Sequence, residues 1–248
     1  YWGKMLDAVL ERPAYPSRRP DDLTMHGTRC ASVIACGKSG QPNVLEAIDV
    51  LPIRVGTGGG RVSIEDLDIA LGLLSAWLQG ATVMSLSIQM LDVLPLTSIV
   101  LGFADLVDVV VIASSGNYQV VGPEPAEFGT SEFTAFPALH PTVLAVGGFD
   151  YCGEWAQWTT KDGEGNPKTT AARWRGVLDL AGPAKSIPTI TTVGGDVGSL
   201  NGTSLAAPIV AGVAALLRVI HPTAPSTAVR DSLRLVPTGG NERLGNGP

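Results

Sequence analysis

The sequence is poor in the residues that build charged surfaces and disulfide frameworks. Only 16% of its 248 residues are charged and the formal net charge is −6, so it has no basic footprint for nucleic acid. Three cysteines leave at least one thiol unpaired and exclude a dense disulfide framework. The longest apolar run, residues 205–217, is shorter than the about 20 residues that a bilayer span requires. We therefore expect no membrane span and no nucleic-acid partner.

The chain has enough hydrophobic residues to form one sizeable core. Hydrophobic residues make up 45% of the chain, and no linker-like or low-complexity stretch divides it, so we expect a single domain over residues 1–248. Strand patterns alternate with helix patterns, which predicts a three-layer α/β/α fold with a mostly parallel central sheet. Low cysteine use fits cytoplasmic and secreted proteins alike, and we favour secretion slightly.

Local patterns predict several elements of this fold. Residues 47–55 predict a strand, which Pro52 weakens because proline has no N–H to donate. Residues 63–66 resemble a capping box, and residues 95–107 and 226–235 predict further helices. After the capping box, apolar residues recur at helical spacing and predict a core-facing stripe: Leu67, Ala70, Leu71, Leu74, Trp77 and Leu78.

A serine at the start of an apolar helix is the first candidate for chemistry. Ser204 lies within residues 201–208, which lead directly into an apolar run. Thr203 or Asn201 can cap the first turn, and we place Pro208 in that turn, where a missing N–H costs little. The free amides and the dipole of the helix favour negative charge near Ser204. Taken alone, the pattern is better explained as an ordinary capped core helix.

An activated serine needs a general base, and the sequence offers three histidines. His140 and His221 each precede a proline, which favours a turn or loop role for both. His26 instead opens residues 26–36, where a small-residue turn leads into an apolar, helical stretch. Its imidazole is expected at a helix start, facing outward, although a simple helix-capping histidine produces the same pattern.

The third candidate is an amide side chain at the end of a predicted buried strand. The β-branched run of residues 108–114 leads through small residues to Asn117. Because active sites of open α/β sheets gather beyond the carboxyl ends of their strands, Asn117 is placed to donate to a developing oxyanion. Gly116-Asn117 is also an ordinary turn dipeptide.

Together these segments resemble the subtilisin-like serine peptidases, the subtilases. The matching motifs are Gly202–Pro208, His26–Thr28 and Ser115–Asn117, and two strand-like segments, residues 81–87 and 142–148, are similar to the family's core strands. The resemblance implies a subtilisin-like fold and a serine endopeptidase that needs no cofactor and acts on polypeptides. Cys30, just after the histidine motif, is similar to a cysteine of the proteinase K branch that lies beneath the catalytic histidine.

The resemblance also implies a role for each site residue. Ser204 would be the nucleophile, His26 the general base and Asn117 the oxyanion donor. Backbone near Gly59 would pair with extended substrate at the edge of the cleft. The slot for the side chain before the scissile bond would be bordered by Ser87, Ile88, Gln89, Ala113, Ser114 and Ser115, together with Ala135. Because these walls carry no charge, we expect an uncharged, medium-sized side chain in the slot.

The catalytic acid departs from the family pattern. Asp7 lacks the family's Asp-x-Gly turn, and Asp21 and Asp22 lie almost against His26 in the sequence. We therefore assign no acid and place the carboxylates of all three residues beyond hydrogen-bond reach of the His26 ring. We expect the acid to come from an N-terminal segment that precedes this numbering, was cleaved off or belongs to another chain.

Two further departures bear on substrate and metal. Gln89 stands where the family usually has a glycine, and its side chain should narrow or reshape the cleft. Residues 37–43, where the family often holds Ca²⁺, contain a lysine and no carboxylate, so we predict no metal there. Two alternatives to a peptidase remain: a pseudoenzyme that serves as a binding or regulatory module, and an esterase or transferase that uses the same nucleophile.

Overall fold

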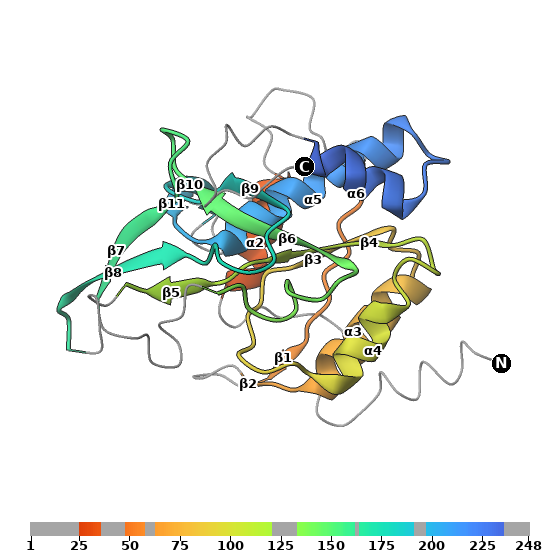
Figure 1. Cartoon of the computed structure of the whole chain (residues 1–248), viewed down its shortest axis with the longest axis horizontal. Helices are drawn as coiled ribbons and strands as arrows, with labels where there is room; N and C mark the ends of the chain where they lie inside the picture. The colour runs from red at the N-terminus through yellow and green to blue at the C-terminus, as the bar shows by residue number, and fades with distance from the viewer. Residues whose placement is uncertain are drawn as a thin grey trace.

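A four-stranded parallel sheet forms the centre of the molecule (Figure 1). The computed structural model describes residues 25–35, 48–57, 63–120, 133–161, 164–190 and 197–235. The strands lie in the order β3 (Val83–Leu86), β4 (Val110–Ser114), β6 (Val143–Phe149) and β9 (Leu180–Pro183). All of them run parallel, so their carboxyl ends meet at one edge.

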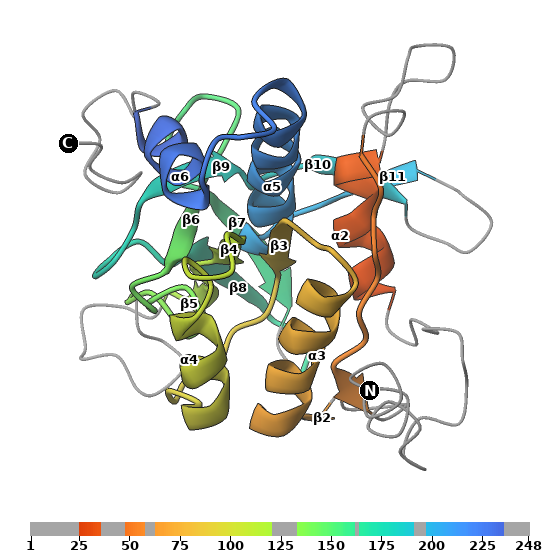
Figure 2. The same cartoon turned by 90° about the vertical axis from the view of Figure 1, so that its right-hand side faces the viewer.

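Helices cover both faces of this sheet (Figure 2). They are α2 (His26–Ala35), α5 (Thr203–Ile220) and α6 (Ser226–Arg234) on one side, and α3 (Asp66–Leu78) and α4 (Pro95–Gly102) on the other. The alternation of side chains along β4 explains the two layers. Val110 and Ile112 pack into a core with α5 and α6, whereas Val111 and Ala113 pack into a core with α3 and α4. The three-layer α/β/α fold predicted from the sequence is confirmed.

Short antiparallel sheets complete the fold. One contains β5 (Asn117–Gln119), β8 (Pro167–Ala172) and β7 (Gln157–Lys161); the other two pair β10 (Ile187–Ile190) with β11 (Val197–Leu200), and β1 (Gly56–Thr57) with β2 (Ser63–Ile64). β5 follows β4 after only two residues and begins with Asn117. The antiparallel sheet therefore presents Asn117 beside the carboxyl edge of the parallel sheet.

The strand predicted over residues 47–55 is wrong for residues 48–55, which form no strand in the structure. Pro52 can donate no ladder hydrogen bond, which accounts for the failure. Ile53 and Val55 nevertheless pack against the core that contains α3 and α4. A β-carbon built on Gly72 of α3 would lie 2.5 Å from Val55 Cγ1, so this approach requires glycine.

Two predictions about α3 and its neighbour are also wrong. Helix α3 begins at Asp66 without a side-chain cap; the carboxylate of Asp66 instead accepts from the Leu96 and Thr97 amides at the start of α4, at 2.8 and 2.7 Å. The helix predicted to reach residue 107 ends at Gly102. The side chain of Asp66 thus caps a helix that begins at Pro95, far along the chain, and no local sequence pattern predicts such a contact.

The apolar stripe predicted as core on α3 lies largely at the surface. Its members Leu67, Leu74, Trp77 and Leu78 are 36–48% exposed, and the buried face is formed by Ile69, Ala70, Leu73 and Ala76. α3 carries apolar residues on more than one face, so their spacing alone could not select the buried one. Between α3 and α4 lies an apolar cavity of about 270 Å³.

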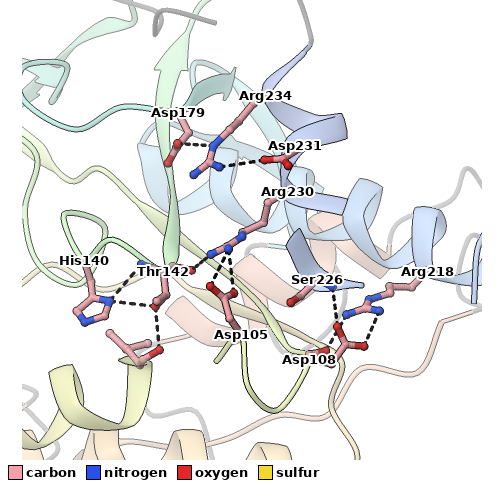
Figure 3. Close-up of polar contacts among 11 residues, drawn as sticks. Asp105, Asp108, His140, Thr142, Asp179, Arg218, Ser226, Arg230, Asp231 and Arg234 are labelled. Atoms are coloured by element: carbon pink, nitrogen blue, oxygen red, sulfur yellow. Dashed lines mark hydrogen bonds and ion pairs between the residues drawn. The ribbon is translucent and has the colours of Figure 1, made fainter. Parts of the chain in front are cut away.

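Ion pairs fasten α5 and α6 to the sheet at the edge opposite its carboxyl ends (Figure 3). Arg218 contacts Asp108 at 3.0 Å, and Arg230 contacts Asp105 at 2.9 Å. Among the described residues, α5 is the one helix long and apolar enough to cross a membrane, with a mean hydropathy of 1.9. Half of it is buried against the sheet, which is typical of a core helix.

Candidate active site

The start of α5 is capped from a distant part of the chain. The residue before the helix is Gly202, which has no capping side chain, so the prediction that Thr203 or Asn201 caps the first turn is wrong. Asn201 Oδ1 instead accepts from the Ser186 amide at 2.7 Å. The cap is Asn117, whose Oδ1 accepts from both the backbone N–H and the hydroxyl of Thr203, each at 3.1 Å.

Pro208 lies inside α5 rather than in its first turn, which corrects the sequence interpretation. Its missing N–H would have bonded the carbonyl of Ser204, four residues earlier. That oxygen accepts instead from Ser87 Oγ at 2.7 Å and from Cys30 Sγ at 3.2 Å. The proline therefore frees the Ser204 carbonyl to connect α5 to α2 and to the segment after β3.

This arrangement predicts that Ser87 and Pro208 are energetically coupled. Ser87→Ala is expected to lower the free energy of unfolding by about 1 kcal/mol, because the Ser204 carbonyl loses its stronger donor. In a Pro208→Ala background the same change should cost less, because the N–H restored at position 208 can bond that carbonyl. Denaturant unfolding of the two single variants and the double variant measures the coupling. Costs that add within about 0.5 kcal/mol would contradict it.

His26 and Ser204 share two neighbours, Ser87 and Cys30. His26 is the first residue of α2 and is exposed; its Nε2 lies 3.1 Å from the Ser87 carbonyl oxygen and 3.8 Å from Cys30 Sγ. A carbonyl oxygen can only accept, so in this contact Nε2 carries a proton and donates it to the Ser87 carbonyl. The buried Cys30 thus lies between the histidine ring and the carbonyl of Ser204.

The other two histidines lie away from this site. His140 precedes β6 at the amino ends of the parallel strands, where its Nδ1 lies 3.0 Å from Thr142 Oγ1 (Figure 3). Burial lowers the pKa of His140. His221 follows the last residue of the 18-residue α5, about 26 Å along the helix from its start. Of the three histidines, only His26 is placed near Ser204.

Two N–H donors border one small space beside Ser204. Because Asn117 Oδ1 is the acceptor for Thr203, Nδ2 is the end of the amide that can donate elsewhere. A β-carbon built on Gly202 would lie 3.5 Å from Asn117 Nδ2, 3.8 Å from the Ser204 backbone nitrogen and 3.9 Å from Asn117 Oδ1, which is already engaged by Thr203. An oxyanion at this point would face both donors, and a side chain at position 202 would fill the space.

The residues predicted to border the substrate slot differ in how exposed they are. Ala113, Ser114 and Ser115 are at most 2% exposed, so they offer almost no surface to a substrate side chain. Ile88 packs against the core that contains α3 and α4. Gln89 is exposed, and its Oε1 accepts from the Asn117 backbone N–H at 2.7 Å.

Several predictions fall outside the described residues and stay predictions. They concern the carboxylates of Asp7, Asp21 and Asp22, the backbone near Gly59, and the absence of a metal from residues 37–43. Within the described part of the chain, no three His, Cys, Asp or Glu side chains lie close enough together to hold a metal ion.

Sequence reasoning missed two contributors to the site, the capping role of Asn117 and the hydrogen bond from Ser87. A signal for the second was present, because a proline four residues after Ser204 leaves a helical carbonyl without its donor. The sequence could not say which side chain would replace that donor.

This fold and this site define a subtilase. The model of the Subtilase family matches residues 9–242, and the chain belongs to that family. Among curated relatives, Subtilisin amylosacchariticus from Bacillus subtilis subsp. amylosacchariticus is 34% identical over 130 residues, 52% of this chain and 29% of that protein. M-protease from Shouchella clausii is 29% identical over 237 residues, 94% of this chain and 54% of that protein. The chain thus spans about half or less of the length of these relatives.

Solved structures show the same likeness. The self-cleaved protease domain of PatA superposes with a TM-score of 0.68 and 25% identity over 90% of this chain and 80% of that one. The prenylagaramide maturation protease PagA superposes with a TM-score of 0.63 and 23% identity over 88% of this chain and 73% of that one. The fold is therefore that of subtilisin-like proteases.

Proposed function

We propose that this chain is a serine endopeptidase that hydrolyses peptide bonds through an acyl-enzyme on Ser204. The observation that carries the proposal is the space beside Ser204, which lies 3.5 Å from Asn117 Nδ2 and 3.8 Å from the Ser204 backbone nitrogen. Preorganised donors of this kind stabilise the oxyanion that forms when a nucleophile attacks a carbonyl. Family membership supports the same chemistry.

The reaction would proceed in two halves. Ser204 Oγ attacks the peptide carbonyl carbon while His26 accepts the hydroxyl proton, and the new oxyanion binds between Asn117 Nδ2 and the Ser204 N–H. Collapse of this intermediate breaks the C–N bond, and His26 returns the proton to the leaving amine. Water, deprotonated by His26, then attacks the ester carbon; the C–Oγ bond breaks, His26 returns the proton to Ser204 Oγ, and the acid is released. To act as the base, the His26 ring must direct an unprotonated nitrogen toward Ser204 Oγ.

A carboxylate near the His26 ring is needed to stabilise the imidazolium that forms when the ring takes the Ser204 proton. We propose that it comes from a segment other than the one that carries Asp7, Asp21 and Asp22. Polypeptide is the substrate that this chemistry requires. The alternative function is a pseudoenzyme that serves as a binding or regulatory module, and one observation favours it: residues 1–25 contain no Asp-x-Gly.

A fluorophosphonate probe distinguishes the two functions. The peptidase predicts covalent labelling at Ser204 in the native protein, because an activated serine attacks phosphorus and the donors beside it stabilise the adduct. Peptide mapping by mass spectrometry locates the label, and denatured protein is the control. Absence of labelling would favour the pseudoenzyme, whereas equal labelling of Ser204→Ala would assign the reactivity to another residue, and either result would reject the proposed acyl-enzyme on Ser204.

A further inference from the structure

We infer that the side chain of Gln89 plugs the slot for the residue before the scissile bond and restricts it to small side chains such as those of glycine and alanine. The inference rests on the proposed function and narrows it, since an uncharged slot alone predicted a medium-sized side chain. Its basis is where the Gln89 amide lies relative to Gly116, Asn117 and Arg173.

The Gln89 amide lies on the face of Gly116. A β-carbon built on Gly116 would lie 2.7 Å from Gln89 Oε1 and 2.9 Å from Arg173 Cδ. The backbone of Gly116 has a φ of +96°, a conformation that glycine adopts freely. The space left by the missing side chain at this position is therefore taken by Gln89 from one side and Arg173 from the other.

A hydrogen bond holds the plug across the slot. Gln89 Oε1 accepts from the backbone N–H of Asn117 at 2.7 Å, which connects the segment after β3 to the first residue of β5. These two segments are the walls between which the substrate side chain would enter. A large side chain must break this bond, whereas a small one can leave it in place.

The surrounding backbone leaves little room for the walls to move apart. Met90 forms two backbone hydrogen bonds with Phe136, at 2.8 and 3.1 Å, and the Ala135 amide donates to the Ser115 carbonyl at 2.9 Å. Arg173 is only 2% exposed, and its Nη1 donates to the Phe133 carbonyl at 2.9 Å. The floor and the walls are thus fixed by backbone contacts, and the exposed Gln89 side chain is the element that can be removed.

The test is a series of fluorogenic peptides that differ only in the residue before the scissile bond: Gly, Ala, Leu or Phe. We expect the native chain to favour Ala over Phe in kcat/KM by at least about 10-fold, within the range by which pocket contacts discriminate. Gln89→Gly should raise kcat/KM for the Phe peptide by about 10-fold or more and change that for the Ala peptide by less than about 3-fold. Gln89→Ala should lie between the two.

Controls separate this inference from the proposed function. Gln157→Ala, at an exposed glutamine of β7, should leave the Phe to Ala ratio unchanged, and thermal unfolding should show that each Gln89 variant is folded. Two results would overturn the inference but leave the proposed function in place, provided that turnover depends on Ser204. One is an equal kcat/KM for the Phe and Ala peptides. The other is a Phe to Ala ratio of kcat/KM that Gln89→Gly does not alter. Absence of Ser204-dependent turnover with every peptide would overturn the proposed function and the inference with it.

Discussion

Ser204→Ala is expected to lower kcat for peptide hydrolysis about 10⁶-fold, a size taken from subtilisin itself. The variant retains the N–H donors beside position 204 but has no oxygen to form the ester. His26→Ala should cost about as much, because without a base the hydroxyl is a weak nucleophile. Since the two groups act in one step, the double variant should be no slower than either single variant. Steady-state kinetics on one fluorogenic peptide measures all three.

The matched control for this prediction is Ser232→Ala, which removes an exposed hydroxyl on α6. It should leave kcat within about 2-fold, since surface changes away from special features have small effects. Losses that multiply in the double variant would mean that Ser204 and His26 act independently. A Ser204→Ala variant that keeps most of the native kcat would assign the activity to another nucleophile.

Asn117→Asp and Asn117→Ala are expected to have equally large effects on turnover but different effects on stability. Both variants lose the Nδ2 donor, so kcat should fall about 10²–10³-fold, a size again taken from subtilisin. The aspartate keeps an oxygen that can accept from Thr203 at the start of α5, where negative charge is favourable. The alanine loses that cap, which should lower the free energy of unfolding by about 1–2 kcal/mol.

Kinetics together with thermal unfolding test this separation of roles. Asn117→Ala should melt several degrees lower than the native chain, about 2–4 °C for each kcal/mol lost, and Asn117→Asp should melt near it. Asn166→Asp, in the exposed turn between β7 and β8, is the control for the charge change. Equal melting of the alanine and aspartate variants would refute the capping role, and native kcat in the aspartate variant would refute the oxyanion role.

The layered fold could be predicted from the sequence because it depends on local periodicity. The β-branched run that ends in Ser114 is buried on both faces of the sheet, as a central parallel strand must be. The prediction that the stripe on α3 is core was wrong because α3 has apolar residues on several faces. Their spacing could not distinguish Leu73, which is buried, from Leu74, which is exposed. The strand predicted for residues 48–55 did not form because a single proline interrupts an otherwise apolar strand pattern.

The site was predictable only as three short motifs. Ser204, His26 and Asn117 were named from their local contexts and from the resemblance that joined them. Contacts across the fold could not be predicted, because no local rule pairs Asn117 with Thr203 across 86 positions, or Ser87 with Ser204 across 117. Those contacts make Asn117 the cap of α5 and connect Ser87 to the same helix.

The most direct test of the proposed mechanism is the mass of the trapped acyl-enzyme. The native chain would be mixed with a p-nitrophenyl ester and quenched in acid within the burst of p-nitrophenol release, and the digested protein analysed by tandem mass spectrometry. The mechanism predicts one acyl group per chain, on Ser204, and none after the same treatment of Ser204→Ala. An acyl group on Cys30 or another residue, or turnover without any adduct, would contradict it.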